Sequence, residues 1–257
     1  MFTPDAFIIY QGTLYQPSVP FLLEKFVTPV CALIEGIWLT EPQRARAILR
    51  ERIYTNYELT PACAGMIKVA AKRVSMMSNS EYSAHRSNAL ANLKESCVSP
   101  RLSTPFDDSS LLHLNFTLLE ARQLVIELKE KVKKNTERFE SARSVGAVLL
   151  GEKGDLLSYA WNDNSVFKFQ HAEHELLRSY VLRNQKKIPD RSTLIVSLKP
   201  CAMCAGQILS QAENFESLQI LYLENDEGPM AQNSALVEGS SLWQSAGLPR
   251  IHIKQIY

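Results

Sequence analysis

HAEHE at residues 171–175 and KPCAMCAG at residues 199–206 are the two stretches that decide the fold. They bring a histidine and two cysteines, His171, Cys201 and Cys204, into a pattern that suits Zn²⁺. Three protein ligands leave one position of a tetrahedral ion open for water, which distinguishes a catalytic zinc from a closed structural one. Glu173 adds a carboxylate two residues after the histidine. At the start of a helix, this spacing lets one side chain hold the metal while the other reaches the substrate.

Two other interpretations of these residues stay open. His174 lies three residues after His171 and shares a helical face with it. With both cysteines it would complete a closed Cys₂His₂ structural zinc, with Glu173 left outside. The pattern could also be a coincidence without any metal. A structural zinc explains neither Glu173 nor the order of strands and helices around it.

Residues 110–257 alternate between helical and strand patterns. Such alternation predicts a three-layer α/β/α domain around a mixed, five-stranded sheet. Two strands within 144–161 should be joined by a turn at residues 151–155. The other expected elements are helices at 111–139, 171–184, 201–212 and 235–244, and strands at 192–198, 218–223 and 250–256.

Residues 1–105 form a mostly helical region of unknown role in this interpretation. A hairpin is expected around Gly12, followed by helices at 40–53, 60–74 and 80–93, the first two capped by Thr40 and Thr60. The Ser-, Pro- and Asp-rich stretch 97–110 separates this region from the second domain. No internal repeat is visible. The cysteines without ligand spacing are expected to be small buried hydrophobic residues: Cys31, Cys63 and Cys97.

Composition limits the classes of function. The chain has 257 residues, of which 46% are hydrophobic, and a formal net charge of +1. This charge supplies no general attraction to nucleic acid. The N-terminus shows no signal peptide, and the longest apolar stretch is too short to span a bilayer. We therefore expect a soluble cytoplasmic protein without a membrane partner.

The H-x-E…P-C-x-x-C pattern is that of the zinc nucleobase deaminases. Together with VGAVLL at 145–150, AWN at 160–162 and LIVSLKPCAMCAGQIL at 194–209, it resembles the tRNA-specific adenosine deaminases. These are the nucleic-acid-editing branch of the cytidine deaminase superfamily. The resemblance covers about residues 110–257. It implies a zinc-dependent nucleobase deaminase with a cytidine deaminase-like fold, in which Glu173 shuttles protons and Asn162 hydrogen-bonds the target nucleoside.

The substrate is less defined than the reaction. Lys199 stands where the family commonly has Glu, and the loop after Leu223 and the C-terminal end also depart from the family pattern. RNA, tRNA-like in particular, is the first candidate, with adenosine or cytidine as target and Phe167 or Phe169 stacking on an extruded base. A free base or nucleoside such as guanine or cytosine is the second, and a catalytically silent zinc-binding regulatory subunit the third.

Two basic clusters and a dimer bear on the partners. Each cluster is either a set of phosphate contacts or a solvated helix face. The first cluster comprises Lys129, Lys131, Lys133, Lys134, Arg138 and Arg143, and the second comprises Lys186, Lys187 and Arg191. Family members often dimerise, so the resemblance also implies a homodimer. Residues 1–105 would either shape the substrate channel or replace that subunit contact.

Overall fold

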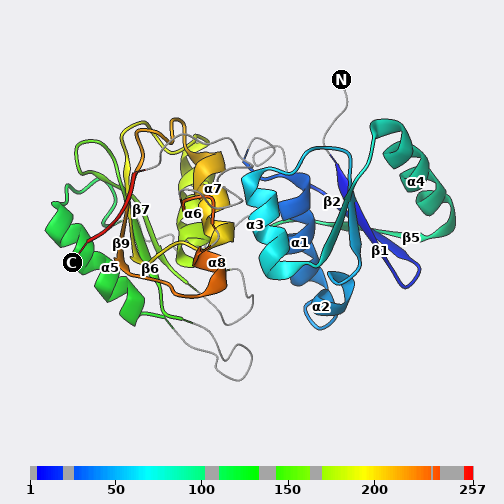
Figure 1. Cartoon of the computed structure of the whole chain (residues 1–257), viewed down its shortest axis with the longest axis horizontal. Coiled ribbons are helices and arrows are strands. Elements are labelled where there is room, and N and C mark those ends of the chain that lie inside the picture. The colour runs from blue at the N-terminus through cyan, green and yellow to red at the C-terminus, as the bar shows by residue number, and fades with distance from the viewer. Residues whose placement is uncertain are drawn as a thin grey trace. The chain divides into compact units, whose positions relative to one another are not determined.

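Two compact units, Met1–Leu102 and Ser103–Tyr257, make up the computed structural model, and each is built around a five-stranded sheet (Figure 1). The structure describes residues 5–19, 26–101, 110–132, 143–162, 170–232, 234–237 and 252–256. Among the helices of these ranges, none combines the length and the apolar character needed to cross a membrane.

The sheet of the C-terminal unit is mixed, with strand order β10-β9-β8-β6-β7. β6 pairs antiparallel with both β7 and β8, whereas β8, β9 and β10 run parallel to one another. The strands are β6 (Gly146–Leu150), β7 (Leu156–Trp161), β8 (Thr193–Leu198), β9 (Gln219–Glu224) and β10 (His252–Gln255).

Helices cover both faces of this sheet, which confirms the predicted three-layer α/β/α arrangement. α5 (Leu118–Glu130) lies on one face, and α6 (Ala172–Asn184) and α7 (Ala202–Gln211) lie on the other (Figure 1). α5 packs through Ala121, Val125 and Leu128 on side chains of β6, β8 and β9. Gly146 permits this close packing, because a Cβ there would lie 2.4 Å from the carbonyl oxygen of Val125.

Two predicted helices of this unit differ from the structure. The helix expected over 111–139 begins only at Leu118, because Thr117 and Glu120 form a capping box there. It ends at Glu130, and residues 133–139 lie outside the described ranges. The helix expected over 235–244 is not present at 234–237, which form a turn, and 238–244 are not described. A one-turn helix, α8 (Pro229–Gln232), precedes it.

The N-terminal unit has more residues in helices than in strands, but its centre is a sheet with strand order β4-β3-β1-β2-β5. The expected hairpin around Gly12 is present as β1 and β2. The strands are β1 (Ala6–Tyr10), β2 (Thr13–Pro17), β3 (Arg52–Thr55), β4 (Arg73–Met76) and β5 (Lys94–Val98). The helices are α1 (Pro29–Thr40), α2 (Ala45–Ile48), α3 (Pro61–Ala70) and α4 (Asn79–Asn92).

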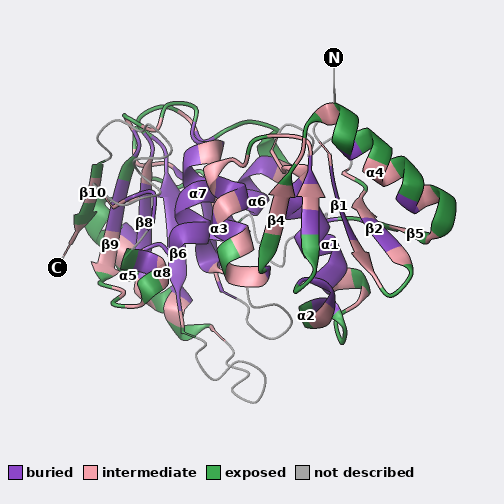
Figure 2. Ribbon diagram, turned by 45° about the vertical axis from the view of Figure 1, so that its right-hand side comes forward, coloured by how far each residue is buried: buried purple, intermediate pink, exposed green. Residues whose placement is uncertain are grey.

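The helix predicted over 40–53 is wrong. Thr40 is the last residue of α1 and not an N-cap, and its hydroxyl donates to the carbonyl oxygen of Gly36 at 2.8 Å. Only the single turn α2 follows before β3 begins at Arg52. The helix capped by Thr60 is confirmed as α3. Figure 2 shows the contrast within the chain between the largely buried α6 and α7 and the mostly exposed α4.

Candidate metal centre and active site

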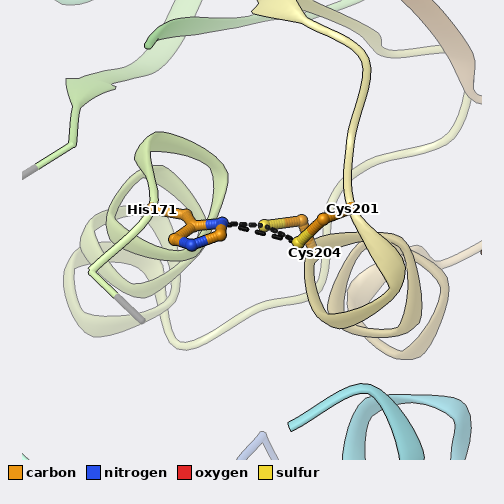
Figure 3. Close-up of side chains that lie close together, drawn as sticks. All are labelled: His171, Cys201 and Cys204. Atoms are coloured by element: carbon orange, nitrogen blue, oxygen red, sulfur yellow. Dashed lines mark hydrogen bonds between the residues drawn. The ribbon is translucent and has the colours of Figure 1, made fainter. Parts of the chain in front are cut away.

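Three side chains from the starts of α6 and α7 converge on one point (Figure 3). His171 is the residue before α6, Cys201 is the residue before α7, and Cys204 is the third residue of α7. The Nδ1 atom of His171 lies 3.5 Å from Sγ of Cys201 and 3.3 Å from Sγ of Cys204, and the two sulfurs are 3.6 Å apart. The predicted ligands therefore form a triangle, with both cysteines buried.

The size of this triangle suits Zn²⁺. A tetrahedral ion with Zn–S near 2.3 Å and Zn–N near 2.0 Å separates its ligands by about 3.6 Å for N···S and about 3.8 Å for S···S. The three observed separations differ from these values by a few tenths of an ångström. No fourth His, Cys, Asp or Glu joins the group among the described residues, so the donor set leaves one coordination position to a non-protein ligand.

Both helices are fixed in place by side-chain hydrogen bonds. The hydroxyl of Ser158, on β7, donates to the carbonyl oxygen of Leu176 in α6 at 3.1 Å. His174 Nδ1 lies 2.7 Å from Oε1 of Gln207 and so connects α6 to α7. At the helix starts, neither His171 nor Cys201 makes a side-chain capping hydrogen bond.

The two sulfurs form a hydrogen bond with each other. Hydrogen bonding from Cys204 holds the pKa of the Cys201 thiol well below its ordinary value, and the nearby His171 acts in the same direction. Burial, and then the same sulfur–sulfur hydrogen bond, raises the pKa of Cys204 well above the ordinary value. Metal binding requires both sulfurs as thiolates and would therefore release protons.

Glu173 lies beside the metal ligands without joining them. It is the second residue of α6, is 3% exposed, and forms a hydrogen bond with the Cys204 side chain. Burial raises the pKa of its carboxyl group to about 7, and the proximity of His171 partly opposes this shift. A carboxyl group with a pKa near neutrality can both accept and return a proton.

The residues expected to bind substrate are less well placed by the structure. Asn162 is buried directly after β7. Its Oδ1 accepts from the backbone N–H of Val145 and its Nδ2 donates to the carbonyl oxygen of Arg143, both at 2.6 Å. Each carboxamide atom keeps one further hydrogen-bonding position. Phe167 and Phe169 lie outside the described residues.

Gln207 is a site residue that sequence reasoning missed. It is buried in α7, where it holds His174. Its position three residues after Cys204 places it one turn further along the same helix, but nothing in the sequence pairs it with a residue of α6. The contact depends on the packing of the two helices against each other.

The contact between His174 and Gln207 bears on the closed Cys₂His₂ alternative, because it assigns His174 a partner other than a metal. We expect His174→Asn to keep its full zinc content, with a loss of stability of about 1 kcal/mol for the altered hydrogen bond. The matched variant His171→Asn should lose zinc. Elemental analysis of both purified variants is the measurement, and loss of zinc from His174→Asn would favour a closed structural site.

Ion pairs engage three of the six described residues of the two predicted basic clusters. Lys129 pairs with Glu224, Arg143 with Asp226, and Arg191 with Glu152 and Asp190. Lys131 lies over the ring of Trp161. The remaining members of the first cluster, Lys133, Lys134 and Arg138, lie outside the described residues.

Lys186 and Lys187 are exposed, and the described residues offer them no ion pair. They follow the C-terminal end of α6, whereas His171, the proposed metal ligand on this helix, stands at its N-terminal end. A helix of this length is about 20 Å long. These lysines could therefore contact only an extended substrate.

The fold and the site define an α/β unit with a candidate three-ligand metal centre and an adjacent acid. Residues 136–243 match the model of a family described as Bd3614-like deaminase. A search of curated proteins finds no significant match.

Solved structures similar to the chain include three deaminases. The dCMP deaminase of cyanophage S-TIM5 is 15% identical, with 53% of this chain and 94% of that chain covered and a TM-score of 0.35. A structure from work on A-to-I editing by tRNA:A34 deaminases is 18% identical. The match covers 54% of this chain and 98% of that chain, with a TM-score of 0.37. The guanine deaminase of Nitrosomonas europaea is 15% identical. The match covers 60% of this chain and 85% of that chain, with a TM-score of 0.40.

Proposed function

We propose that the protein is a zinc-dependent hydrolytic deaminase of a nucleobase. The main observation behind this proposal is that the buried Glu173 lies beside three candidate metal ligands, which leave one coordination position of the ion open. The family match over residues 136–243 supports deaminase chemistry. His171, Cys201 and Cys204 would hold the ion. When bound, Zn²⁺ lowers the pKa of water to about 7 and so makes a nucleophile available at neutral pH.

Glu173 carries out the proton transfers in this proposal. Deamination replaces an exocyclic amine by oxygen, and it consumes one water and releases one ammonia. The carboxylate takes a proton from the attacking water, gives it to the ring nitrogen, and later helps to protonate the departing amine. Burial keeps bulk water away from this exchange. The same carboxyl group argues against a silent regulatory subunit, which has no need of a proton carrier.

A base within RNA is the substrate that we propose first, with adenosine or cytidine as the target. The resemblance to the tRNA-editing enzymes in the segments around Asn162 and Cys201 supports this choice. Asn162 has one donor and one acceptor position left for a nucleoside after its bonds to the backbone. The target base would be flipped out or lie in a loop. Phe167 and Phe169 remain candidates for stacking on it.

A free base or nucleoside is the second candidate, and the ion pairs favour it. Lys129, Arg143 and Arg191 are engaged by carboxylates of the same unit. A cation neutralised in this way attracts phosphate weakly. A small substrate needs no phosphate contacts.

An assay of RNA binding and of turnover separates the two candidates. For an RNA substrate we expect inosine or uridine in the RNA and binding that weakens steeply with salt, because counterions are released. Lys186→Gln/Lys187→Gln should then reduce the salt slope, by about 0.7 for each phosphate of a single strand that the variant no longer neutralises. Conversion of free bases without RNA binding at low salt would support the second candidate. Failure to release ammonia from any RNA, base or nucleoside would contradict both.

A further inference from the structure

The N-terminal unit repeats the topology of the C-terminal unit. Its first four strands are ordered β4-β3-β1-β2, and the corresponding strands of the other sheet are ordered β9-β8-β6-β7. In each unit a hairpin comes first, and the third strand pairs antiparallel with the first strand of the hairpin. The fourth strand runs parallel to the third. The repeat that the sequence does not show is therefore present in the fold.

The helices correspond as well. α1 follows the hairpin of the N-terminal unit and precedes its third strand, as α6 does in the C-terminal unit. α3 connects the third strand to the fourth, as α7 does in the C-terminal unit. α1 packs on α3 and α6 packs on α7. The fifth strand differs, because β5 joins the β2 edge whereas β10 joins the β9 edge. Among the described elements, α5 before β6 and α2 before β3 also have no counterpart in the other unit.

The starts of these helices match residue by residue. Thr28, the N-cap of α1, has φ −73° and ψ 153°, and His171, the N-cap of α6, has the same values. Thr60 precedes α3 with φ −68° and ψ 161°, where Cys201 precedes α7 with φ −72° and ψ 172°.

The third residue of both α3 and α7 is a cysteine. Cys63 begins the stretch CAGMI, and Cys204 begins the stretch CAGQI. The three positions that correspond to the metal ligands are thus Thr28, Thr60 and Cys63.

These three side chains also meet in space. The hydroxyl of Thr28 lies 3.0 Å from Sγ of Cys63, and the hydroxyl of Thr60 donates to the same sulfur at 3.2 Å. Each threonine also accepts the backbone N–H three residues on, from Cys31 and Cys63 respectively, at 3.3 Å. Threonine hydroxyls are not among the ligands that zinc takes in proteins. Hydrogen bonds therefore occupy the place that a metal would have.

Two further positions follow the same correspondence. The second residue of α6 is Glu173, and the second residue of α1 is Val30, which cannot carry a proton. The third residue of α6, His174, bonds to Gln207 of α7. Its counterpart Cys31 bonds to Cys63 of α3, and this bond is the main cause that lowers the pKa of Cys63 to about 6. The hydroxyls of Thr28 and Thr60 lower the pKa of Cys63 in the same direction.

We propose that the N-terminal unit is a second copy of the fold of the C-terminal unit, in which hydrogen bonds among Thr28, Thr60 and Cys63 replace the metal centre and Val30 replaces the acid. It is a metal-free and catalytically silent copy. The correspondence of the folds stands by itself, while the description of the triad as a replaced metal centre rests on the proposed function.

Rebuilding the ligand set tests this inference. Thr28→His/Thr60→Cys would restore a His/Cys/Cys triangle with Cys63. Measured by elemental analysis after gel filtration, the zinc content should rise by one ion per chain over the parent protein. Thr28→Val/Thr60→Val, which removes the hydroxyls without supplying ligands, should show no rise. Adding Cys63→Ala to the rebuilt variant should abolish the rise. A folded, rebuilt variant without extra zinc would overturn the description of Thr28, Thr60 and Cys63 as a replaced metal centre.

Two further measurements cover a rebuilt variant that does not fold. The milder Thr60→Cys restores a Cys-x-x-Cys pair at the start of α3 and should bind Co²⁺ with thiolate charge-transfer absorption that Thr60→Ser lacks. Absence of that absorption would count against the proposal. In the parent protein, Cys63→Ala should leave the zinc content unchanged, and its loss would overturn the metal-free assignment. A parent protein without zinc would contradict the proposed function alone, since the rise in the variants is measured relative to it.

Discussion

Glu173→Gln should lower kcat by about a thousandfold, within the range that a positioned acid–base group contributes. Glutamine has nearly the same shape and can form hydrogen bonds, but it cannot take up and return a proton. Because Glu173 is buried and is not one of the clustered metal ligands, the change should leave metal binding in place. The measurement is the rate of ammonia release at saturating substrate, together with zinc content and a thermal unfolding curve.

A matched control for this variant is Glu213→Gln. Glu213 is an exposed carboxylate of the same unit, just beyond α7, so its loss should leave kcat unchanged. Full activity in Glu173→Gln would contradict the proposed proton transfer. Loss of both activity and zinc would instead indicate that the carboxylate is needed to form the metal centre.

Removal of zinc should abolish turnover and destabilise the C-terminal unit. An ion present at about a thousand times its Kd stabilises the folded state by about 4 kcal/mol. For a unit of this size, that corresponds to a fall in Tm of roughly 10 °C. Chelation followed by dialysis, and separately Cys204→Ala, should both produce this fall. Only the chelated protein should recover when zinc is returned.

Cys97→Ala is the control for the cysteine change. The expectation that Cys97 is buried is wrong, because it is exposed in β5. It lies outside the candidate metal centre, so its loss should alter neither zinc content nor turnover. Unchanged activity and unchanged Tm in the chelated protein would contradict a metal-dependent site.

The part of the site that the sequence could predict was the set of metal ligands, from the spacing of the histidine and the two cysteines along the chain. His171, Cys201 and Cys204 cluster because each stands at a helix start, and helix starts follow from local signals. The contacts of Asn162 with Val145 and Arg143 could not be predicted, because they join segments that only the sheet brings together.

The N-terminal fold was harder to predict for physical reasons. α1 is buried on nearly all sides, so it lacks the polar face by which an amphipathic helix is recognised in a sequence. β3 and β4 have four residues each, too few to show alternation clearly. The repeat was hidden because the helix starts share little beyond the Cys-Ala-Gly of residues 63–65 and 204–206.

The N-cap positions have a consequence for how the chain folds during synthesis. Thr28 and Thr60 cap their helices, and such a cap stabilises a helix by about 1 kcal/mol. His171 and Cys201 forgo that stabilisation. The N-terminal unit, which is synthesised before the C-terminal unit, can therefore fold on its own hydrogen bonds, and domains generally fold in the order of their synthesis. Under the proposed function only the C-terminal unit requires an ion, so zinc supply should govern the maturation of that unit alone.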